Sequence, residues 1–253
     1  MDLEPDHAGR SNECYDAWTK SNIQALMTVL RQYQVPLSAF IVGKSISKNK
    51  DIVTYLAQQK TEFHLHSYSH DLRYPDSAKE ITKGVRAFRA FFHAPPSGYR
   101  APEGRISSQG YATLQKKGFV FDSSIFPSFW PHPKYFFQKR TIHKNAYNLI
   151  EVPITVVSPF RLIFSLSWIH LFGWRIYRLL LTLFPLPNSV IFDFHLHDLY
   201  TVPTTKTLPM FWRYIYRKNA ENELQLLQTV LDYLHKKGYI FVPMSTLISH
   251  KNI

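Results

Sequence analysis

Apolar and polar positions follow two periods along this chain, one typical of helices and one typical of strands. In the first predicted helix apolar side chains recur at helical spacing, at Ile23, Leu26, Met27 and Leu30. Pro36 ends that pattern, and the apolar run within residues 38–42 predicts a buried strand. The succession continues to a last predicted helix over 224–234 and a final strand at 239–242. The pattern therefore predicts an α/β chain.

Between these ends the predicted strands and helices take turns. Further strands are expected at residues 62–66, 97–100, 119–122, 149–157 and 189–194. Further helices are expected around 52–56, from the capping box Ser77–Glu80, and from Ser108 to the basic residues before Gly118. Such alternation favours a distorted (β/α) barrel of about seven parallel strands over an open sheet. No boundary interrupts it, so residues 1–253 are expected to form a single domain.

Composition narrows the class of protein without deciding its function. A chain of 253 residues with 45% hydrophobic content can bury a substantial core, and Cys14 alone allows no intrachain disulfide. The net charge of +12 fits a nucleic-acid partner, an anionic polymer, a membrane surface or simply a solvated basic surface. Because Lys and Arg are scattered and no nucleic-acid-binding motif is present, no nucleic-acid partner is expected. A peripheral contact with a membrane or an anionic polymer stays open.

The sequence shows neither a secretory signal nor a membrane span. Its first residues are acidic and polar, whereas a signal peptide begins with a basic segment followed by an apolar one. The apolar stretch 162–184 is interrupted by His170, Arg175 and Arg178, which leaves no uncharged run long enough to cross a bilayer. We therefore expect a location in the cytoplasm or at the periphery of the cell envelope.

Candidate chemistry begins with a pair of histidines. His66 and His70 lie four residues apart directly after a predicted strand, a spacing that turns both rings toward one point in a helical turn or tight loop. Alone this signal is weak, because the chain has 12 histidines. Carboxylates at the chain start, Asp2, Glu4 and Asp6, add a second kind of metal-ligating group.

The ends of the predicted strands strengthen this signal. His66, Arg100, Asp122 and His195 each close a predicted strand. In parallel barrels the catalytic face is formed by the carboxyl ends of the strands. Four ionisable residues at such positions predict one active site.

Five short motifs now suggest a family. In chain order they are Asp2-Leu-Glu4-Pro-Asp6, His66-Ser-Tyr-Ser-His70, Tyr99-Arg-Ala-Pro102, Phe121-Asp-Ser-Ser124 and Phe194-His-Leu-His-Asp198. With them the sequence resembles the NodB-homology polysaccharide deacetylases, a carbohydrate esterase family, and within it the branch whose first motif reads Asp-x-Glu. The resemblance covers essentially the whole chain, because the motifs occur in family order.

The resemblance implies a metal-dependent hydrolase that removes acetyl groups from N-acetylated polysaccharides or oligosaccharides. His66 and His70 would be metal ligands, with either Glu4 or Asp6 as the third. Two imidazoles and a carboxylate leave positions open on a divalent ion, most simply Zn²⁺, although Co²⁺ or Ni²⁺ would fit the same donors.

The resemblance also implies catalytic roles. Asp2 would be the general base, held in its ionised form by Arg100. His195 would be the general acid, with His197 as the alternative, and Asp122 would hydrogen-bond that histidine and raise its pKa. The backbone N–H of Glu103 could stabilise the oxyanion.

Two further expectations concern the edges of the site. The first strand is expected to be truncated, since only Met1 precedes Asp2, and this would weaken catalysis. One rival to deacetylation is hydrolysis of another non-peptide C–N bond, since related barrels catalyse such reactions. The other is a catalytically weakened carbohydrate-binding protein, which the truncated strand would explain. A group of aromatic residues could stack on sugar rings or simply cover the barrel, namely Phe126, Phe129, Trp130 and Tyr135.

Overall fold

A computed structural model describes residues 1–253 except 8, 10, 201, 218–222 and 250–253. Its main sheet has the order β1-β2-β3-β4-β5-β7-β6. The parallel strands are β1 (Asp2–Leu3), β2 (Ser38–Ile41), β3 (Glu62–Leu65), β4 (Gly98–Tyr99), β5 (Phe121–Asp122) and β7 (Ile150–Glu151). The edge strand β6 (His143–Lys144) runs antiparallel to β7.

The sheet curves back on itself through segment 189–195. The N–H of Asp2 donates to the C=O of Phe194 at 3.0 Å, and Asp2 and His195 form a parallel bridge. On its other side the segment contacts Thr155, whose N–H donates to the C=O of Ile191 at 3.1 Å. The chain is thus a (β/α) barrel, as the alternation predicted, although this segment makes only isolated bridges where a regular strand was expected.

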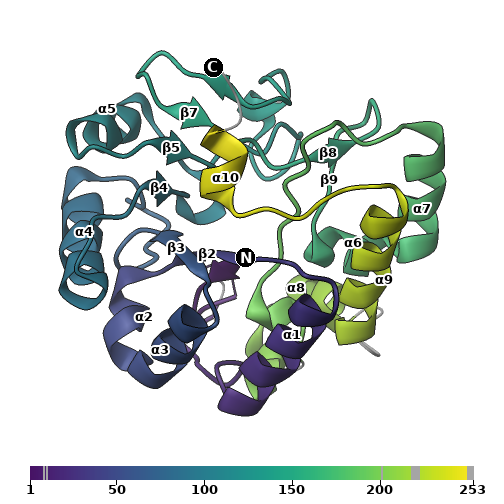
Figure 1. The fold of residues 1–253 in the computed structure, drawn as a ribbon, viewed down its shortest axis with the longest axis horizontal. Coiled ribbons are helices and arrows are strands. Elements are labelled where there is room, and N and C mark those ends of the chain that lie inside the picture. The colour runs from purple at the N-terminus through teal and green to yellow at the C-terminus, as the bar shows by residue number, and fades with distance from the viewer. Residues whose placement is uncertain (8, 10, 201, 218–222, 250–253) are drawn as a thin grey trace.

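Helices surround the strands (Figure 1). They are α1 (Lys20–Gln32), α2 (Gly43–Lys48), α3 (Lys50–Gln58), α4 (Ala78–Phe92), α5 (Ser108–Lys116), α6 (Leu166–Phe172), α7 (Trp174–Leu183), α8 (Met210–Arg217), α9 (Glu223–Lys236) and α10 (Met244–Ser249). A two-stranded hairpin, β8 (Val156–Val157) and β9 (Leu162–Ile163), precedes α6. Among the described residues, no helix combines the length and apolar character that a bilayer crossing requires.

Local chemistry explains where several helices begin. Thr19 accepts a hydrogen bond from the N–H of Asn22 at the start of α1, and Ser77 accepts one from the N–H of Glu80 at the start of α4. The predicted capping box is only half formed, because the Glu80 carboxylate bonds to Ser69 instead of returning to Ser77.

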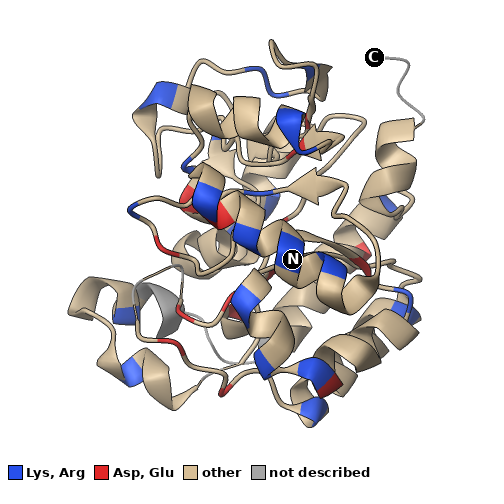
Figure 2. Ribbon diagram, turned by 90° about the vertical axis from the view of Figure 1, so that its left-hand side faces the viewer, with Lys and Arg blue, Asp and Glu red and all other residues tan. Residues whose placement is uncertain are grey.

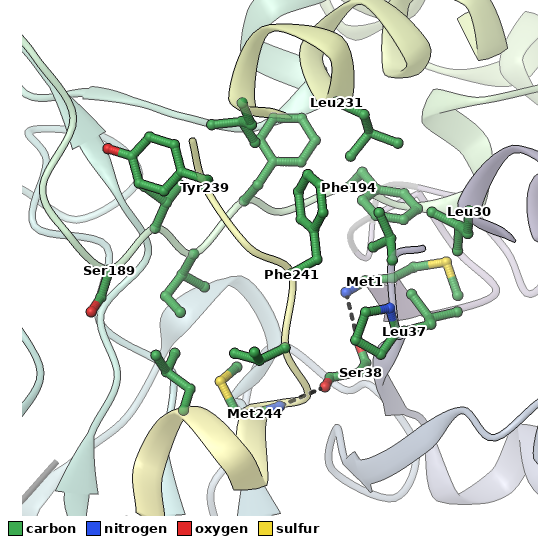
Figure 3. Close-up of a pocket in the computed structure, with 18 of the residues that line it drawn as sticks. Met1, Leu30, Leu37, Ser38, Ser189, Phe194, Leu231, Tyr239, Phe241 and Met244 are labelled. Atoms are coloured by element: carbon green, nitrogen blue, oxygen red, sulfur yellow. Dashed lines mark hydrogen bonds between the residues drawn. The ribbon is translucent and has the colours of Figure 1, made fainter. Parts of the chain in front are cut away.

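The predicted strand at 239–242 is wrong. These residues form no ladder and run across the amino-terminal end of the barrel into α10, whose first N–H, that of Met244, donates to the Ser38 hydroxyl at 3.0 Å. Phe241 is partly buried and packs its ring against the core, whereas Ile240 is 84% exposed, so the apolar run reflects the packing of some of its side chains and not strand pairing. Tyr239, Phe241 and Met244 border a mostly apolar cavity of about 540 Å³ at this end (Figure 3).

Candidate active site

The carboxyl ends of the parallel strands bring most of the predicted residues to one place. β1 carries Asp2, His66 follows β3, Arg100 follows β4, and His195 ends segment 189–195. Asp2 is only 4% exposed, and its strand pairs with β2 on one side and with segment 189–195 on the other, so its carboxylate is held firmly in the barrel.

Glu4, His66 and His70 form a compact donor cluster. The Glu4 Oε2 atom lies 2.9 Å from Nε2 of His70 and 3.5 Å from Nε2 of His66, and the two imidazole centroids are 5.0 Å apart. One ligand atom from each residue lies within 4.8 Å of the other two, which is the spacing a shared cation requires. The predicted convergence of the two rings is therefore present.

The far nitrogens of both rings are held by acceptors. Nδ1 of His66 bonds the C=O of Arg100 at 2.8 Å, and Nδ1 of His70 lies 2.8 Å from the Asp6 carboxylate. These contacts hold a proton on Nδ1, so Nε2, which faces Glu4, is the atom that could coordinate a cation after losing its own proton. Both Nε2 atoms are buried without a well-formed hydrogen bond, so the donor set fits a divalent cation with Asp6 as a support for His70.

Charges inside the cluster reinforce one another. Burial lowers the pKa of His70, but the Glu4 and Asp6 carboxylates outweigh it and raise that pKa to about 10. Burial likewise raises the pKa of Glu4, yet His70 and His195 bring it well below its usual value. The Glu4 carboxylate therefore stays ionised in this buried site, and an ionised carboxylate is suited to bind a cation.

The loop carrying the two histidines is fixed from outside the motif. Ser67 and His70 adopt left-handed backbone conformations, with φ of 57° and 62°, and the His70 N–H donates to the Ser67 hydroxyl at 3.1 Å. The Glu80 carboxylate accepts the N–H and hydroxyl of Ser69 at 2.8 and 2.9 Å. Glu80 therefore positions the loop, a role its place in a predicted capping box concealed.

Arg100 bridges two carboxylates. Its Nη1 donates to Asp2 at 2.5 Å and to Asp193 at 2.6 Å, while Nε and Nη2 bond Ser123. Burial raises the pKa of Asp2, but Arg100, together with His66, His195 and the N-terminal amine, lowers that pKa below the usual value. Asp193 was not singled out in the sequence, although its position two residues before His195 on an extended segment puts both side chains on one side.

His195 is held by Asp198, not by Asp122. Its Nδ1 lies 2.9 Å from Oδ2 of Asp198, while its Nε2 faces Asp2 and Glu4 at 3.9 Å each. Burial lowers the pKa of His195, but Glu4 and Asp198 raise it to about 10. The ring is therefore a proton donor at neutral pH.

His197, the alternative to His195, has a different environment. Its ring stacks between those of His7 and His195, with centroids 4.7 and 4.6 Å away. Burial, followed by the repulsion of His195, lowers the pKa of His197 to about 3. A ring that stays neutral at neutral pH is a poor general acid.

Asp122 does not make the predicted contact with His195. Its carboxylate accepts the N–H and hydroxyl of Ser124 at 2.8 and 2.7 Å, and the Ser124 hydroxyl in turn accepts the Ala101 N–H at 2.8 Å. Asp122 thus supports the turn that follows Arg100. The register of β5 and β7 also places it opposite Glu151.

The aromatic residues expected near the mouth fall into two groups. Tyr135 is buried, and its hydroxyl donates to the C=O groups of Gly104 and Ile106, so it supports the turn after Arg100. Phe129 and Trp130 are 65% and 46% exposed, and the Trp130 ring lies 6.2 Å from that of Trp212 on α8.

Fold and cluster together define an α/β barrel with a histidine–carboxylate centre at its strand ends. Residues 11–121 match the sequence model of the family described as polysaccharide deacetylase, which confirms the resemblance that the motifs predicted. The matched segment contains His66, His70 and Arg100, while Asp2, Glu4 and His195 lie outside it.

The chain is also similar to individual proteins, one in sequence and two in fold. The chain is 27% identical over 107 residues to a peptidoglycan deacetylase of Helicobacter pylori, an alignment covering 41% of this chain and only 36% of that protein. A probable polysaccharide deacetylase from Pseudomonas aeruginosa PAO1 shares the fold with a TM-score of 0.64 at 11% identity, covering 98% of this chain and 88% of the other. Puue allantoinase shares it with a TM-score of 0.62 at 12% identity, covering 98% of this chain and 87% of the other.

Proposed function

We propose that this chain is a metal-dependent hydrolase that removes N-acetyl groups from a carbohydrate polymer or glycan. The observation that carries the proposal is the gathering of Asp2, Glu4, His66, His70 and His195 in one buried cluster. The family match over 11–121 and the Helicobacter pylori relative support this reaction, and an acetylated polymer of the cell envelope as substrate.

Glu4, His66 and His70 would hold the metal, with zinc as the first choice and cobalt or nickel compatible with the same donors. When bound, a divalent cation supplies Lewis-acid polarisation of the acetyl carbonyl and a lower pKa for water. Asp6 and the Arg100 carbonyl would keep each imidazole aimed at it.

Asp2 would act as general base. The Arg100 guanidinium keeps its carboxylate ionised, and Nε2 of His66 lies 3.8 Å from its Oδ2. The carboxylate can therefore accept a proton from water beside the ligand cluster. Arg100 would position the Asp2 carboxylate, and its guanidinium also pairs with the Asp193 carboxylate.

His195 would act as general acid. Asp198 holds its Nδ1, and the neighbouring carboxylates keep the ring protonated, so Nε2 can give a proton to the leaving nitrogen. The backbone N–H of Glu103, on the turn that Asp122 supports through Ser124, would stabilise the oxyanion.

The proposal is tested with purified protein and acetylated chitooligosaccharide or peptidoglycan fragments. We expect acetate release that depends on added Zn²⁺. His66→Ala and His70→Ala should lose stoichiometric metal, as measured by mass spectrometry of the protein, whereas Asp2→Asn should keep metal and lose about 10²–10⁴-fold in rate. His235→Ala, an exposed histidine on α9, is the matched control and should keep both.

The products separate this reaction from its rivals. Ammonia or a ring-opened product in place of acetate would assign the site to another C–N bond. Stoichiometric metal and saturable glycan binding without turnover would identify a binding protein. Unchanged metal content in both histidine variants would refute the ligand assignment.

A further inference from the structure

The outward face of α7 is apolar where a surface helix is normally polar. Ile176, Leu179 and Leu183 recur at i, i+3 and i+7 and are 48%, 60% and 61% exposed, whereas Tyr177 and Leu181 face the core. We call Ile176, Leu179 and Leu183, with the flanking Arg175 and Arg178, the α7 face. Contiguous exposed apolar surface of this kind marks a binding surface in a water-soluble domain.

Further apolar side chains extend the surface at both ends of the helix. Phe172, just before α7, is 37% exposed, and Phe160, in the β8–β9 turn, is 73% exposed. That turn lies beside the end of α7, since Pro159 and Phe184 border the same depression of about 440 Å³. Figure 1 shows α7 at the outer edge of the molecule.

Within residues 152–192, the segment that carries this surface, the charged side chains have one sign. Arg175 and Arg178 are exposed on α7, Arg161 follows the Phe160 turn, and the sequence has no Asp or Glu from residue 152 to 192. Two copies meeting through this face would bring arginines together without a local carboxylate to pair them. An apolar stripe flanked by arginines instead complements an anionic bilayer, in which the side chains enter the acyl boundary and the guanidinium groups meet phosphates.

We propose that the α7 face binds the surface of an anionic membrane. The inference does not rest on the proposed reaction. It places the membrane contact that the basic charge allows on one helix, because α7 combines exposed apolar side chains with positive charge.

α4 supplies a built-in contrast on the opposite side of the barrel. Lys79, Lys83, Arg86 and Arg89 are exposed along it, but the large apolar side chains Ile81 and Phe88 are buried. Figure 2 shows the basic residues in blue on the helices of this side. If charge alone attracted the protein to membranes, α4 would serve as well as α7.

The test is co-sedimentation of the full chain with vesicles of phosphatidylcholine containing phosphatidylglycerol, and with vesicles of phosphatidylcholine alone. We expect binding to the anionic vesicles only, and its loss in Ile176→Ser/Leu179→Ser/Leu183→Ser. Arg175→Glu/Arg178→Glu should weaken it roughly tenfold or more. The charge-matched Lys83→Glu/Arg86→Glu on α4 should weaken it less than threefold.

Thermal unfolding of each variant checks that the fold is kept, which we expect because all altered side chains are exposed. Absence of anionic-vesicle binding, or equal losses from the α4 and α7 charge variants, would overturn the proposal. Dimerisation in analytical ultracentrifugation that disappears in the triple-serine variant, without vesicle binding, would assign the face to a second copy instead.

Discussion

The two ends of the barrel are built from the same strands but carry opposite kinds of side chain. At the carboxyl ends, buried carboxylates, imidazoles and a guanidinium lie within hydrogen-bonding range of one another. At the amino ends, the cavity of about 540 Å³ is lined mainly by apolar residues such as Leu37, Leu231 and Phe241 (Figure 3).

This difference shows why size alone does not locate a reaction. The large apolar cavity offers room but few ionisable groups, whereas the polar end holds carboxylates, imidazoles and a guanidinium close to one another. Arg100 connects the ends, because its side chain borders the cavity while its guanidinium holds Asp2 and Asp193. If the two ends are energetically separate, a substitution at one end should leave the properties of the other unchanged.

Arg100→Met should have the largest effect. It leaves Asp2 and Asp193 buried side by side without their shared counter-ion, and losing one partner of a buried pair costs about 3–5 kcal/mol of unfolding free energy. Denaturant unfolding measures the loss, and deacetylation should fall with it. Arg100→Lys, which keeps the charge, should recover part of the stability; a loss below about 1 kcal/mol in the Met variant would contradict the bridge.

Leu37→Ala should come next and should affect stability only. Leu37 is 5% exposed at the edge of the apolar cavity, so truncation removes buried contacts and costs about 2–3 kcal/mol. Metal content and the KM for substrate should stay at their original values. A change in metal stoichiometry would show that the two ends are coupled.

Glu80→Gln should be smaller and should act on the polar end. The amide can still accept from Ser69, but it loses the charge-assisted bonds that hold the His66–His70 loop, at a cost of about 1–2 kcal/mol. We expect weaker metal affinity with little change in the rate of the metal-saturated enzyme. Lys79→Gln, one residue earlier and exposed, is the control.

The smallest expected effect is a pH dependence of stability from the Asp122–Glu151 pair. Burial raises the pKa of Asp122 to about 7, and burial together with Asp122 raises that of Glu151 well above its usual value. The folded chain therefore retains protons that the unfolded chain releases near pH 4, so the contribution is full below that pH and is lost as pH rises through 7.

Between pH 6 and pH 8 the loss from Asp122 should amount to roughly 1–2 kcal/mol of unfolding free energy. Glu151→Gln should flatten the profile in thermal unfolding at several pH values. A profile with the same slope in the parent and the variant would show that the pair does not hold the extra protons.

Local sequence signals predicted the parts of the fold that depend on near neighbours. The 3.6-residue period of Ile23 to Leu30 and the Ser77 cap produced α1 and α4 where expected. The segment 239–242 was misread because a short apolar run does not require strand pairing: here Phe241 packs on the core from an unpaired segment, and Ile240 is exposed.

In the candidate site, the same limit separates the predicted contacts from the missed ones. The cluster of Asp2, Arg100, His66 and His70 was foreseen because parallel strands end at one edge. The partners of His195 and Ser69 were not foreseen. Asp122 and Asp198 are equally suitable acceptors for His195 until their distances are known, and Glu80 could equally have bonded Ser77 at the helix start or Ser69 in the loop.

The sequence by itself determined the alternation of strand and helix, the residue types at the strand ends and the excess of positive charge. Only the tertiary structure decided that Asp6 supports His70, that Asp198 and not Asp122 holds His195, and that Leu179 and Leu183 of α7 face outward. The reason is that residue type and spacing specify which interactions are available, whereas burial and geometry select among acceptors of equal chemistry.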